Sequence, residues 1–399
     1  MKIVVNGAGI AGPALAYWLH HFGHEPILIE RAPAPRTGGY IVDFWGVGFD
    51  IAEKMGILDR LNELGYLVQE IQWVDAEGKT TGSYDPEMLR RIAKGRFVSV
   101  ERYDLATTIF NALEGKVETI FDDSIAEIEE RDDGVRVSFE NSAPRDVDLV
   151  VGADGLHSKV RELVFGPIGQ FEKDLGLRVG AIELDGYHPR EELVFKSHTE
   201  PSRQVSRFTK RGDKTLVLFG FRDQYVQGEL PHDDAGRKRE IEKAMAGVGW
   251  ECPQLLAAMA DVDEVYYDKV SQIHMDHWTK GRVALIGDAA GAVSLLAGEG
   301  TGIGMLEGYL LAGEIHRAGD DYATAFARYE ARVKDFVASK QKNAVHVGSV
   351  FVPKTRLGIR VRDLLTHLFR GPFIAKLALG DLKDDIDVPD YDAEPGSPH

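Results

Sequence analysis

The sequence is nearly free of cysteine, because Cys252 is the only one among 399 residues. A single cysteine excludes an intrachain disulfide and any metal cluster built on cysteine ligands. Pro253 and the apolar pair Leu255 and Leu256 follow it, a context that favours a packed thiol over a reactive one. We therefore expect Cys252 to be structural.

Positive charge is also scarce. The chain has 47 Lys and Arg against 64 Asp and Glu, which gives a formal net charge of −17. A nucleic-acid partner requires a basic face that neutralises phosphates, so this balance argues against one. The hydrophobic content of 44% and the length of 399 residues fit an ordinary globular protein with two or more lobes.

Long hydrophobic runs are missing as well. No apolar stretch reaches the length that a membrane-spanning helix needs. Met1 and Lys2 lead directly into an apolar strand, without the charged region and cleavage site of a signal peptide. We expect a cytoplasmic protein.

The most informative stretch is residues 3–12, Ile-Val-Val-Asn-Gly-Ala-Gly-Ile-Ala-Gly. A buried strand runs into Gly7, Gly9 and Gly12 and then into an apolar helix over 12–22, which is the context that the dinucleotide fingerprint requires. Gly7 permits the tight turn, Gly9 lets the backbone approach a pyrophosphate, and Gly12 allows close helix packing. The N-terminus of the helix offers free N–H groups to phosphates.

A second expected strand over 26–29 ends at Glu30, whose carboxylate can accept hydrogen bonds from a ribose diol. The strand, the glycines, the helix and the acid in register predict a dinucleotide site. The alternative is a glycine turn that binds no ligand.

Two later segments repeat the pattern of an apolar strand that ends in an acid beside a glycine. The first is residues 148–161 with Asp154 and Gly155, and the second is 281–290 with Gly287 and Asp288. Ligands of open α/β sheets bind at the carboxyl ends of such strands. Glycines over 298–302 then precede a helix, whose N-terminus suits a flavin ring edge that becomes negative on reduction.

The remaining pattern predicts both helices and a second, mainly antiparallel sheet. Helices are expected over 47–64, 233–247, 302–317 and 322–347, with a further helix that carries Arg102. Strands are expected over 68–76, 97–100, 178–184, 191–196, 204–209, 215–221 and 264–275, and a hairpin turns at 132–134. Gly38 and Gly39 are expected to form a turn.

These three glycine-acid segments, in this order, resemble the class A flavoprotein monooxygenases, the family of para-hydroxybenzoate hydroxylase, over about residues 1–320. The resemblance implies a Rossmann-like FAD-binding domain, discontinuous in sequence, with an inserted β-rich substrate domain and C-terminal helices. The implied parts are 1–70, 102–170 and 270–322 for FAD, 71–101 and 171–269 for substrate, and a helical segment 323–383. The end of the chain, 384–399, is acidic and rich in Pro, Gly and Ser, a composition that predicts a disordered tail.

The resemblance also implies which residues bind the cofactor. Gly7, Gly9 and Gly12 would face the FAD pyrophosphate, Glu30 the adenosine ribose, and Arg102 the phosphates and ribityl chain. Asp154 and Gly155 resemble a motif tied to both FAD and NAD(P)H, and Asp288 the acid on the ribityl or ribose. The full expected set is Gly7, Gly9, Ala11, Gly12, Glu30, Arg31, Arg102, Asp154, Gly155, Gly287, Asp288, Gly298, Gly300, Thr301 and Gly302. Arg161 would either stabilise the Asp-Gly loop or contact the pyridine nucleotide.

Three positions depart from the family pattern. Gly291 stands where many members have histidine, Leu295 where a proline is common, and Glu299 where the motif has glutamine. These segments look more like a bacterial branch that includes tetracycline-inactivating monooxygenases.

The implied activity is that of an NAD(P)H-dependent monooxygenase, with NADPH or NADH as transient reductant. A flavin C4a-hydroperoxide would transfer oxygen from O₂ to an aromatic or polycyclic small molecule. The protein's share is to orient the reactants and exclude water. A flavin-dependent reductase without oxygen insertion is the first alternative, and a flavin-binding sensor the second.

Residues that contact the substrate are nominated from position alone: Asp43, Phe44 and Trp45 after the Gly38-Gly39 turn, and Phe208, Phe219 and Phe221 on the second sheet. Arginines on this sheet offer a site for an acidic or phenolate substrate. Ordinary core packing is the alternative for the aromatic residues. The spacing of His274 and His277 suggests a metal, but no carboxylate-rich partner supports one. The oligomeric state stays open.

A basic amphipathic section over 354–376 mixes Lys and Arg with leucines. Peripheral membrane contact is one interpretation. The favoured one is a helix packed across the main body with its charged side in solvent.

Overall fold

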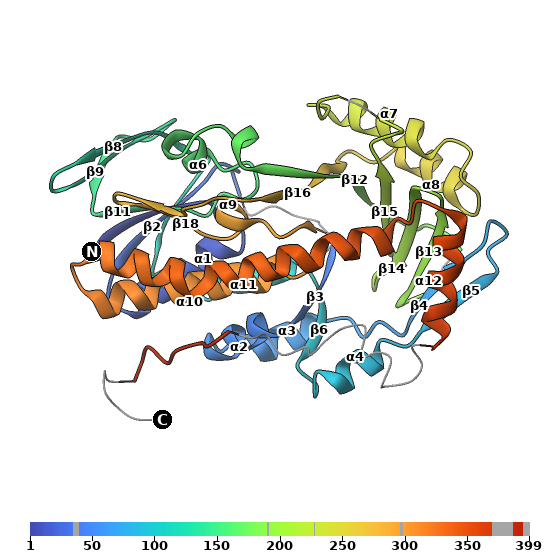
Figure 1. Cartoon of the computed structure of the whole chain (residues 1–399), viewed down its shortest axis with the longest axis horizontal. Coiled ribbons are helices and arrows are strands. Elements are labelled where there is room, and N and C mark those ends of the chain that lie inside the picture. The colour runs from blue at the N-terminus through green and yellow to red at the C-terminus, as the bar shows by residue number, and fades with distance from the viewer. Residues whose placement is uncertain (35–39, 190, 227, 296–297, 369–385, 394–399) are drawn as a thin grey trace.

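The computed structural model describes residues 1–34, 40–189, 191–226, 228–295, 298–368 and 386–393. The expected turn at Gly38 and Gly39 lies outside these residues. Two large sheets stand toward opposite ends of the molecule, and long helices run between them (Figure 1). The fold is α/β, as the sequence predicts.

The first sheet is built around β1 (Lys2–Asn6), which pairs in parallel with β2 (Glu25–Glu30) and β11 (Leu149–Gly152). β7 (Glu118–Phe121), β18 (Val283–Leu285) and the antiparallel β17 (Thr279–Lys280) complete the order β17-β18-β11-β1-β2-β7. Residues 3–5 in β1 are fully buried, which explains why the strand is continuously apolar. Segments far apart in the sequence therefore build one sheet.

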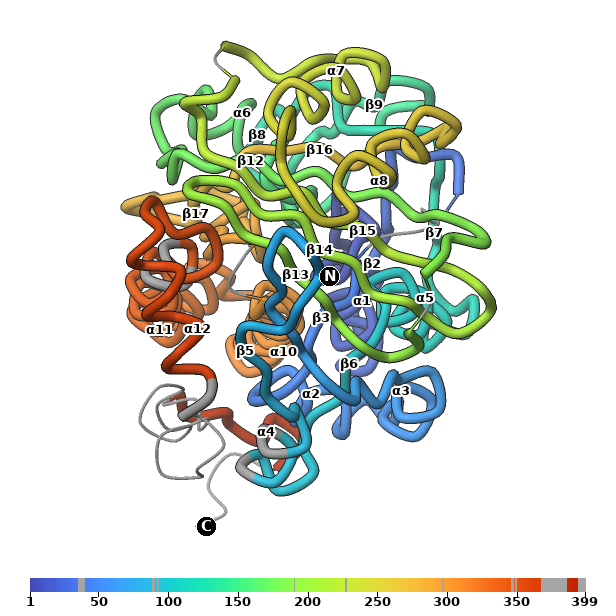
Figure 2. The backbone as a smooth tube through the Cα atoms, turned by 90° about the vertical axis from the view of Figure 1, so that its right-hand side faces the viewer, coloured from blue at the N-terminus to red at the C-terminus, as the bar shows by residue number. Residues whose placement is uncertain are grey.

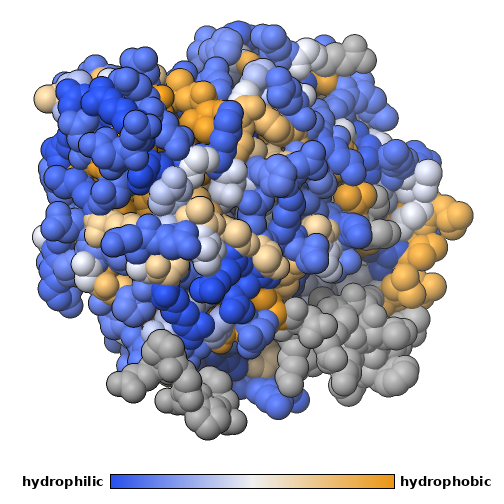
Figure 3. Space-filling view, turned by 60° about the vertical axis from the view of Figure 1, so that its left-hand side comes forward, coloured by the Kyte–Doolittle hydropathy of each residue, from blue (hydrophilic) through white to orange (hydrophobic). Residues whose placement is uncertain are grey.

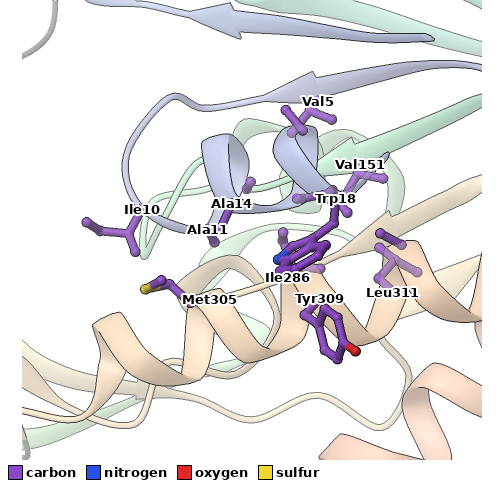
Figure 4. Close-up of a cluster of buried hydrophobic side chains, with 14 of the residues drawn as sticks. Val5, Ile10, Ala11, Ala14, Trp18, Val151, Ile286, Met305, Tyr309 and Leu311 are labelled. Atoms are coloured by element: carbon purple, nitrogen blue, oxygen red, sulfur yellow. The ribbon is translucent and has the colours of Figure 1, made fainter. Parts of the chain in front are cut away.

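Two helices pack tightly beside this sheet, α1 (Ala11–His21) and α10 (Gly300–Ala318). A Cβ added at Gly308 of α10 would lie 2.8 Å from the backbone nitrogen of Leu15, so glycine permits this close approach. The Trp18 and Tyr309 rings meet edge to face with centroids 4.7 Å apart (Figure 4). This contact fixes the glycine loops that precede both helices relative to each other.

The second sheet has the order β16-β12-β15-β14-β13-β4-β5 and is antiparallel except where β13 pairs with β4. Its strands are β4 (Glu70–Val74), β5 (Thr80–Tyr84), β12 (Glu172–Asp185), β13 (Val194–Glu200), β14 (Arg203–Thr209), β15 (Lys214–Arg222) and β16 (Tyr266–Ile273). α7 (Asp234–Met245) and α8 (Cys252–Met259) share a buried cluster with one face of this sheet. Cys252 is fully buried in that cluster, as expected.

Between the sheets, β3 (Ile41–Trp45) pairs with β6 (Phe97–Glu101), and α5 (Arg102–Asn111) follows directly. The single helix expected over 47–64 is wrong, because the chain forms α2 (Val47–Lys54) and α3 (Leu58–Leu64). Gly56, at a φ of 71°, interrupts the helix between them. The other elements are α4 (Glu87–Ile92), β8 (Ile125–Arg131), β9 (Gly134–Phe139), β10 (Arg145–Val147), α6 (Lys159–Val164) and α9 (Asp288–Gly291).

The C-terminal helices connect the two ends of the molecule. α11 (Tyr322–Phe351) runs from the first sheet toward the second, and α12 (Arg356–Leu368) lies against β5 at the outer edge (Figures 1 and 2). No described helix is both long enough and apolar enough to span a membrane.

The expectation of a disordered tail over 384–399 is wrong for residues 386–393. Tyr391 is 2% exposed, donates a 2.7 Å hydrogen bond to Glu314, and packs 5.2 Å from the Tyr309 ring. One buried aromatic ring with a carboxylate partner outweighs the acidic, Pro-rich composition of this stretch.

Candidate functional site

Three glycine turns meet at the carboxyl end of the parallel sheet. Gly7 has a φ of 111°, and a Cβ there would lie 2.5 Å from the Ala153 carbonyl oxygen. A Cβ at Gly12 would lie 1.9 Å from the Gly7 carbonyl oxygen. By contrast, a Cβ at Gly9 or Gly155 would meet no heavy atom within 4 Å. Packing thus requires glycine at positions 7 and 12. Gly9 and Gly155 instead face open space, which leaves room for a ligand such as a pyrophosphate close to the protein backbone.

Glu30 is the last residue of β2 and lies beside the first of these turns. Its two carboxylate oxygens accept hydrogen bonds from the backbone N–H groups of Ala8, at 2.8 Å, and Ala32, at 2.9 Å. The side chain is therefore fixed at the strand end, with lone pairs left for a ribose hydroxyl. Its neighbour Arg31 is exposed.

Asp154 organises the second turn. Its carboxylate accepts hydrogen bonds from Asn6 Nδ2 at 2.9 Å, Ser158 Oγ at 2.5 Å and the backbone N–H of Lys159 at 2.7 Å. These bonds tie β1 to the start of α6. Asp154 therefore shapes the loop that carries Gly155.

Arg161 is buried with 1% exposure. It donates from Nη1 to the Ala289 carbonyl at 3.0 Å and from Nη2 to the Leu156 carbonyl at 2.6 Å. The guanidinium thus ties the second glycine turn to the third. Of its two expected roles, this geometry matches the stabiliser of the Asp-Gly loop. The expected contact with a pyridine nucleotide stays a prediction, and both terminal nitrogens already donate to carbonyls.

The third turn presents Asp288, opposite Arg102 at the start of α5. Desolvation by the surrounding residues raises the pKa of Asp288, and the positive charges of Arg102 and Arg161 offset part of the rise. Within the described chain, neither the Asp288 carboxylate nor the Arg102 guanidinium makes a hydrogen bond or ion pair. The Asp288 side chain is exposed and Arg102 is half-buried, so a carboxylate and a cation without partners in the described chain are open to a ligand. Such groups fit ligand hydroxyls and phosphates respectively. The residues present therefore fit FAD.

Two tyrosines that the sequence did not single out border this region. Tyr40 and Tyr266 have ring centroids 5.9 Å apart, and burial raises the pKa of both hydroxyls. Both hydroxyls also sense the charges of Arg102 and Asp288. They lie far apart in the sequence, and no motif marks them.

A small cavity opens beside the third glycine loop. The cavity brings together residues 43–45, which were expected to contact substrate, and the glycine loop 298–302, which was expected to contact FAD. Side chains from α11 complete its lining. Its lining includes Asp43, Phe44, Trp45, Gly298, Glu299, Thr301, Gly302, Phe336 and Lys340. Asp43 accepts a 2.6 Å hydrogen bond from Ser99 Oγ, and burial raises the pKa of the Asp43 carboxyl. The sequence did not predict the contribution of Phe336 and Lys340, because helix periodicity alone does not show which residues face a distant loop.

The aromatic residues of the second sheet are not part of this cavity. Phe219 and Phe221 are fully buried with α7 and α8, and Phe208 packs in a separate cluster with Tyr66 and Leu216. Their nomination as substrate contacts is wrong for Phe219 and Phe221, since β15 turns them toward the helices. Arg178, Arg203, Arg207 and Arg222 likewise bind protein partners.

Each departure from the family pattern has a packing partner. A Cβ at Gly291 would lie 2.8 Å from the Trp278 ring, so a histidine does not fit there. Leu295 packs with Leu177 and Val179 of the second sheet. Glu299 forms a 2.9 Å ion pair with Lys340.

Glu307 of α10 is a further buried residue that no sequence motif singled out. Its Oε2 accepts a hydrogen bond from the Gly287 N–H, and its Oε1 is buried without a partner. Burial raises the pKa of Glu307 to about 8. A glutamate inside an apolar helix stretch was the available signal.

The described residues contain no group of three or more His, Cys, Asp or Glu side chains arranged to hold a metal. His274 instead shares a 3.0 Å hydrogen bond with Gln272, and His277 lies 3.7 Å from Glu330.

Comparison with known proteins places this geometry in a family. Residues 1–339 match the family described as "FAD binding domain". An uncharacterized Mycobacterium tuberculosis protein is 38% identical over 85% of this chain and 91% of its own. A flavin-dependent monooxygenase of Legionella longbeachae is 31% identical over 91% and 92%. The crystal structure of tetracycline destructase Tet(51) superposes with a TM-score of 0.83 at 32% identity, covering 98% of this chain and 99% of that one.

The chain therefore belongs to the FAD-binding family of class A flavoproteins. It is a flavin-dependent monooxygenase, similar in structure to the tetracycline destructases.

Proposed function

We propose that this monooxygenase hydroxylates an aromatic or polycyclic small molecule, with NADPH or NADH as transient reductant. The observation that carries the proposal is the cavity where Phe44 and Trp45 meet the glycine loop that includes Thr301. Aromatic walls suit a flat ring system, and an adjacent flavin supplies the oxygen chemistry when bound. The name tetracycline destructase, borne by structures 32% and 31% identical to this chain, favours a polycyclic substrate.

The proposed FAD site uses the three converging turns. The first turn with Glu30 would receive the adenosine end, Arg102 the phosphates, and Asp288 the hydroxyls of the ribityl chain. The helix N-termini at α1 and α10 add N–H donors for negative charge. The remaining expected cofactor residues, Ala11, Arg31, Gly298, Gly300 and Gly302, stay proposals.

The cavity walls would orient the substrate and limit water. Asp43 lies at the cavity with its carboxyl held by Ser99, so it can accept or donate a hydrogen bond to a phenolic hydroxyl. Trp45 and Phe336 provide the apolar surface. Water exclusion matters because a reduced, oxygen-reactive flavin in open solvent releases peroxide instead of product.

NAD(P)H would make a transient contact with the FAD domain. The sequence holds one complete GxGxxG motif, at Gly7 to Gly12. No second motif of this kind marks a separate domain for NAD(P)H. The proposed division remains an FAD part of 1–70, 102–170 and 270–322 with a substrate part of 71–101 and 171–269.

The test is to purify the protein with FAD and measure NADPH and NADH oxidation, oxygen uptake and product mass across a panel of polycyclic phenols, with tetracycline as one probe. We expect a panel member to stimulate both oxidation and oxygen uptake and to gain one oxygen atom. Gly9→Val serves as the control, because a Cβ at this position meets no protein atom within 4 Å and the added side chain would enter the proposed pyrophosphate space. Hydride transfer to the substrate without oxygen uptake would favour the reductase alternative.

A further inference from the structure

α12 exposes an apolar stripe and buries part of its polar surface. Leu357, Val361 and Leu364 recur at spacings of four and three residues, so they share one helix face. These side chains are 71%, 46% and 62% exposed. An ordinary surface helix buries such a stripe. The favoured expectation for this basic section, a packed helix with its charged side in solvent, holds for the packing of α12 and for Arg356 and Arg360. It is wrong for the buried Arg362 and for the exposed leucine stripe.

The buried side of α12 is held by polar contacts to the second sheet. Arg362 donates to Thr199 Oγ1 at 3.2 Å and to Gln204 Oε1 at 3.3 Å. Asp363 pairs with Arg362 at 2.9 Å and accepts a 2.7 Å hydrogen bond from Thr81. A half-turn rotation would break all of these contacts, so they keep the leucine stripe pointing outward.

The margin of this stripe is basic. Lys354, Arg356 and Arg360 are exposed. Asp363 is the only acid between residues 354 and 368, and it is buried in its pair with Arg362. The cations therefore stand out in a chain whose formal net charge is −17. An apolar stripe bordered by Lys and Arg is the pattern of helices that lie in a membrane interface.

We propose that α12 docks the protein on an anionic lipid surface. Leu357, Val361 and Leu364 would enter the boundary between headgroups and acyl chains, while Arg356 and Arg360 contact the lipid phosphates. The helix lies at the outer edge of the molecule (Figures 1 and 2), and hydrophobic side chains protrude at the right-hand edge of Figure 3, where α12 falls in that view. The contact is peripheral and does not depend on the proposed substrate.

Charge argues for a lipid surface over a second copy of the chain. A two-fold contact through the same face would bring the cations of both copies together. The exposed side of α12 offers no acid to neutralise them. An anionic bilayer satisfies the leucines and the cations at once.

The test is co-sedimentation of the FAD-loaded full-length protein with vesicles of phosphatidylcholine, alone or with about 30% phosphatidylserine. We expect binding to the anionic vesicles that weakens as salt is added. The affinity of the triple variant Leu357→Ser, Val361→Ser and Leu364→Ser for these vesicles should be lower by about tenfold or more. Arg356→Glu with Arg360→Glu should remove the preference for phosphatidylserine.

Two matched controls lie elsewhere on the surface. Leu67→Ser changes a side chain that is 65% exposed, and Arg60→Glu reverses a cation of α3 that is 60% exposed. Both should bind vesicles like the parent protein. FAD content and NADPH oxidation should be the same in all variants, which verifies folding.

A gain-of-signal variant keeps the test decisive if the triple variant folds poorly. The Leu357→Trp fluorescence should shift to the blue when anionic vesicles are added. Absence of both sedimentation and the blue shift at low salt would overturn the proposal, as would unchanged binding of a folded triple variant. Conversion of a dimer to a monomer by the triple variant, with no vesicle binding by the parent, would instead identify a second copy as the occupant.

Discussion

Lys340 Nζ lies 2.9 Å from a carboxylate oxygen of Glu299, which links α11 to the third glycine loop. The same ammonium stands 5.3 Å from the Trp45 ring centroid and 5.2 Å from that of Phe336. Its side chain is 16% exposed, so the pair is largely shielded from solvent. The family motif has glutamine at the position of Glu299. In this chain the negative charge of Glu299 is balanced by Lys340.

We expect Lys340→Met and Glu299→Gln each to weaken FAD binding about three- to tenfold, because either change loosens the loop against α11. Since the two residues act as a pair, the double variant should be no weaker than the worse single variant, with a coupling energy of about 1 kcal/mol. Titration of FAD by fluorescence quenching measures this. Lys334→Met, on the same helix, should leave the affinity unchanged, and purely additive effects would contradict the pairing.

The sequence predicted those parts of the site that depend on local chain geometry. Gly7, Gly9, Gly12 and Asp288 follow from strand-turn-helix order alone, since each lies at a strand end. Lys340 and Tyr266 did not emerge, because their place depends on how elements far apart in the sequence pack. Phe219 was assigned to the wrong face of its sheet for a similar reason. Alternation shows that two faces differ but not which one meets the cofactor domain.

Asp288 should lower the stability of the FAD-free protein and contribute to the binding of FAD. Desolvation by the surrounding residues raises the pKa of its carboxyl although the side chain is open to the site, and the described chain gives it no hydrogen bond. Asp288→Asn should therefore leave the FAD-free protein as stable as the parent or more stable. FAD affinity should fall about ten- to hundredfold, because a charge-assisted hydrogen bond to a hydroxyl is lost. Thermal unfolding without FAD and FAD titration separate the two effects; a clear loss of stability without FAD would contradict this role.

Arg161 should behave in the opposite way. Arg161→Met leaves the Leu156 and Ala289 carbonyls without their donor, and we expect a loss of about 2–4 kcal/mol in unfolding free energy. FAD affinity should fall together with stability, because both glycine turns loosen. Urea denaturation and FAD titration measure these changes. A stable variant with normal FAD binding and a raised KM for NADPH would instead support a direct contact between Arg161 and the pyridine nucleotide.

Glu307 should make the protein less stable as pH rises. Burial raises the pKa of this carboxyl to about 8 in the folded chain, so the folded state holds a proton that the unfolded chain releases at lower pH. Stability is therefore fully present below the unfolded pKa and declines as pH rises through the folded value, by about 2–4 kcal/mol between pH 5 and 8. Glu307→Gln keeps an acceptor for the Gly287 N–H but cannot titrate, so its unfolding free energy should vary less over the same range. Denaturation of both proteins without FAD at pH 5.5 and pH 8 tests this, and parallel pH profiles would show that Glu307 is ionised in the folded protein.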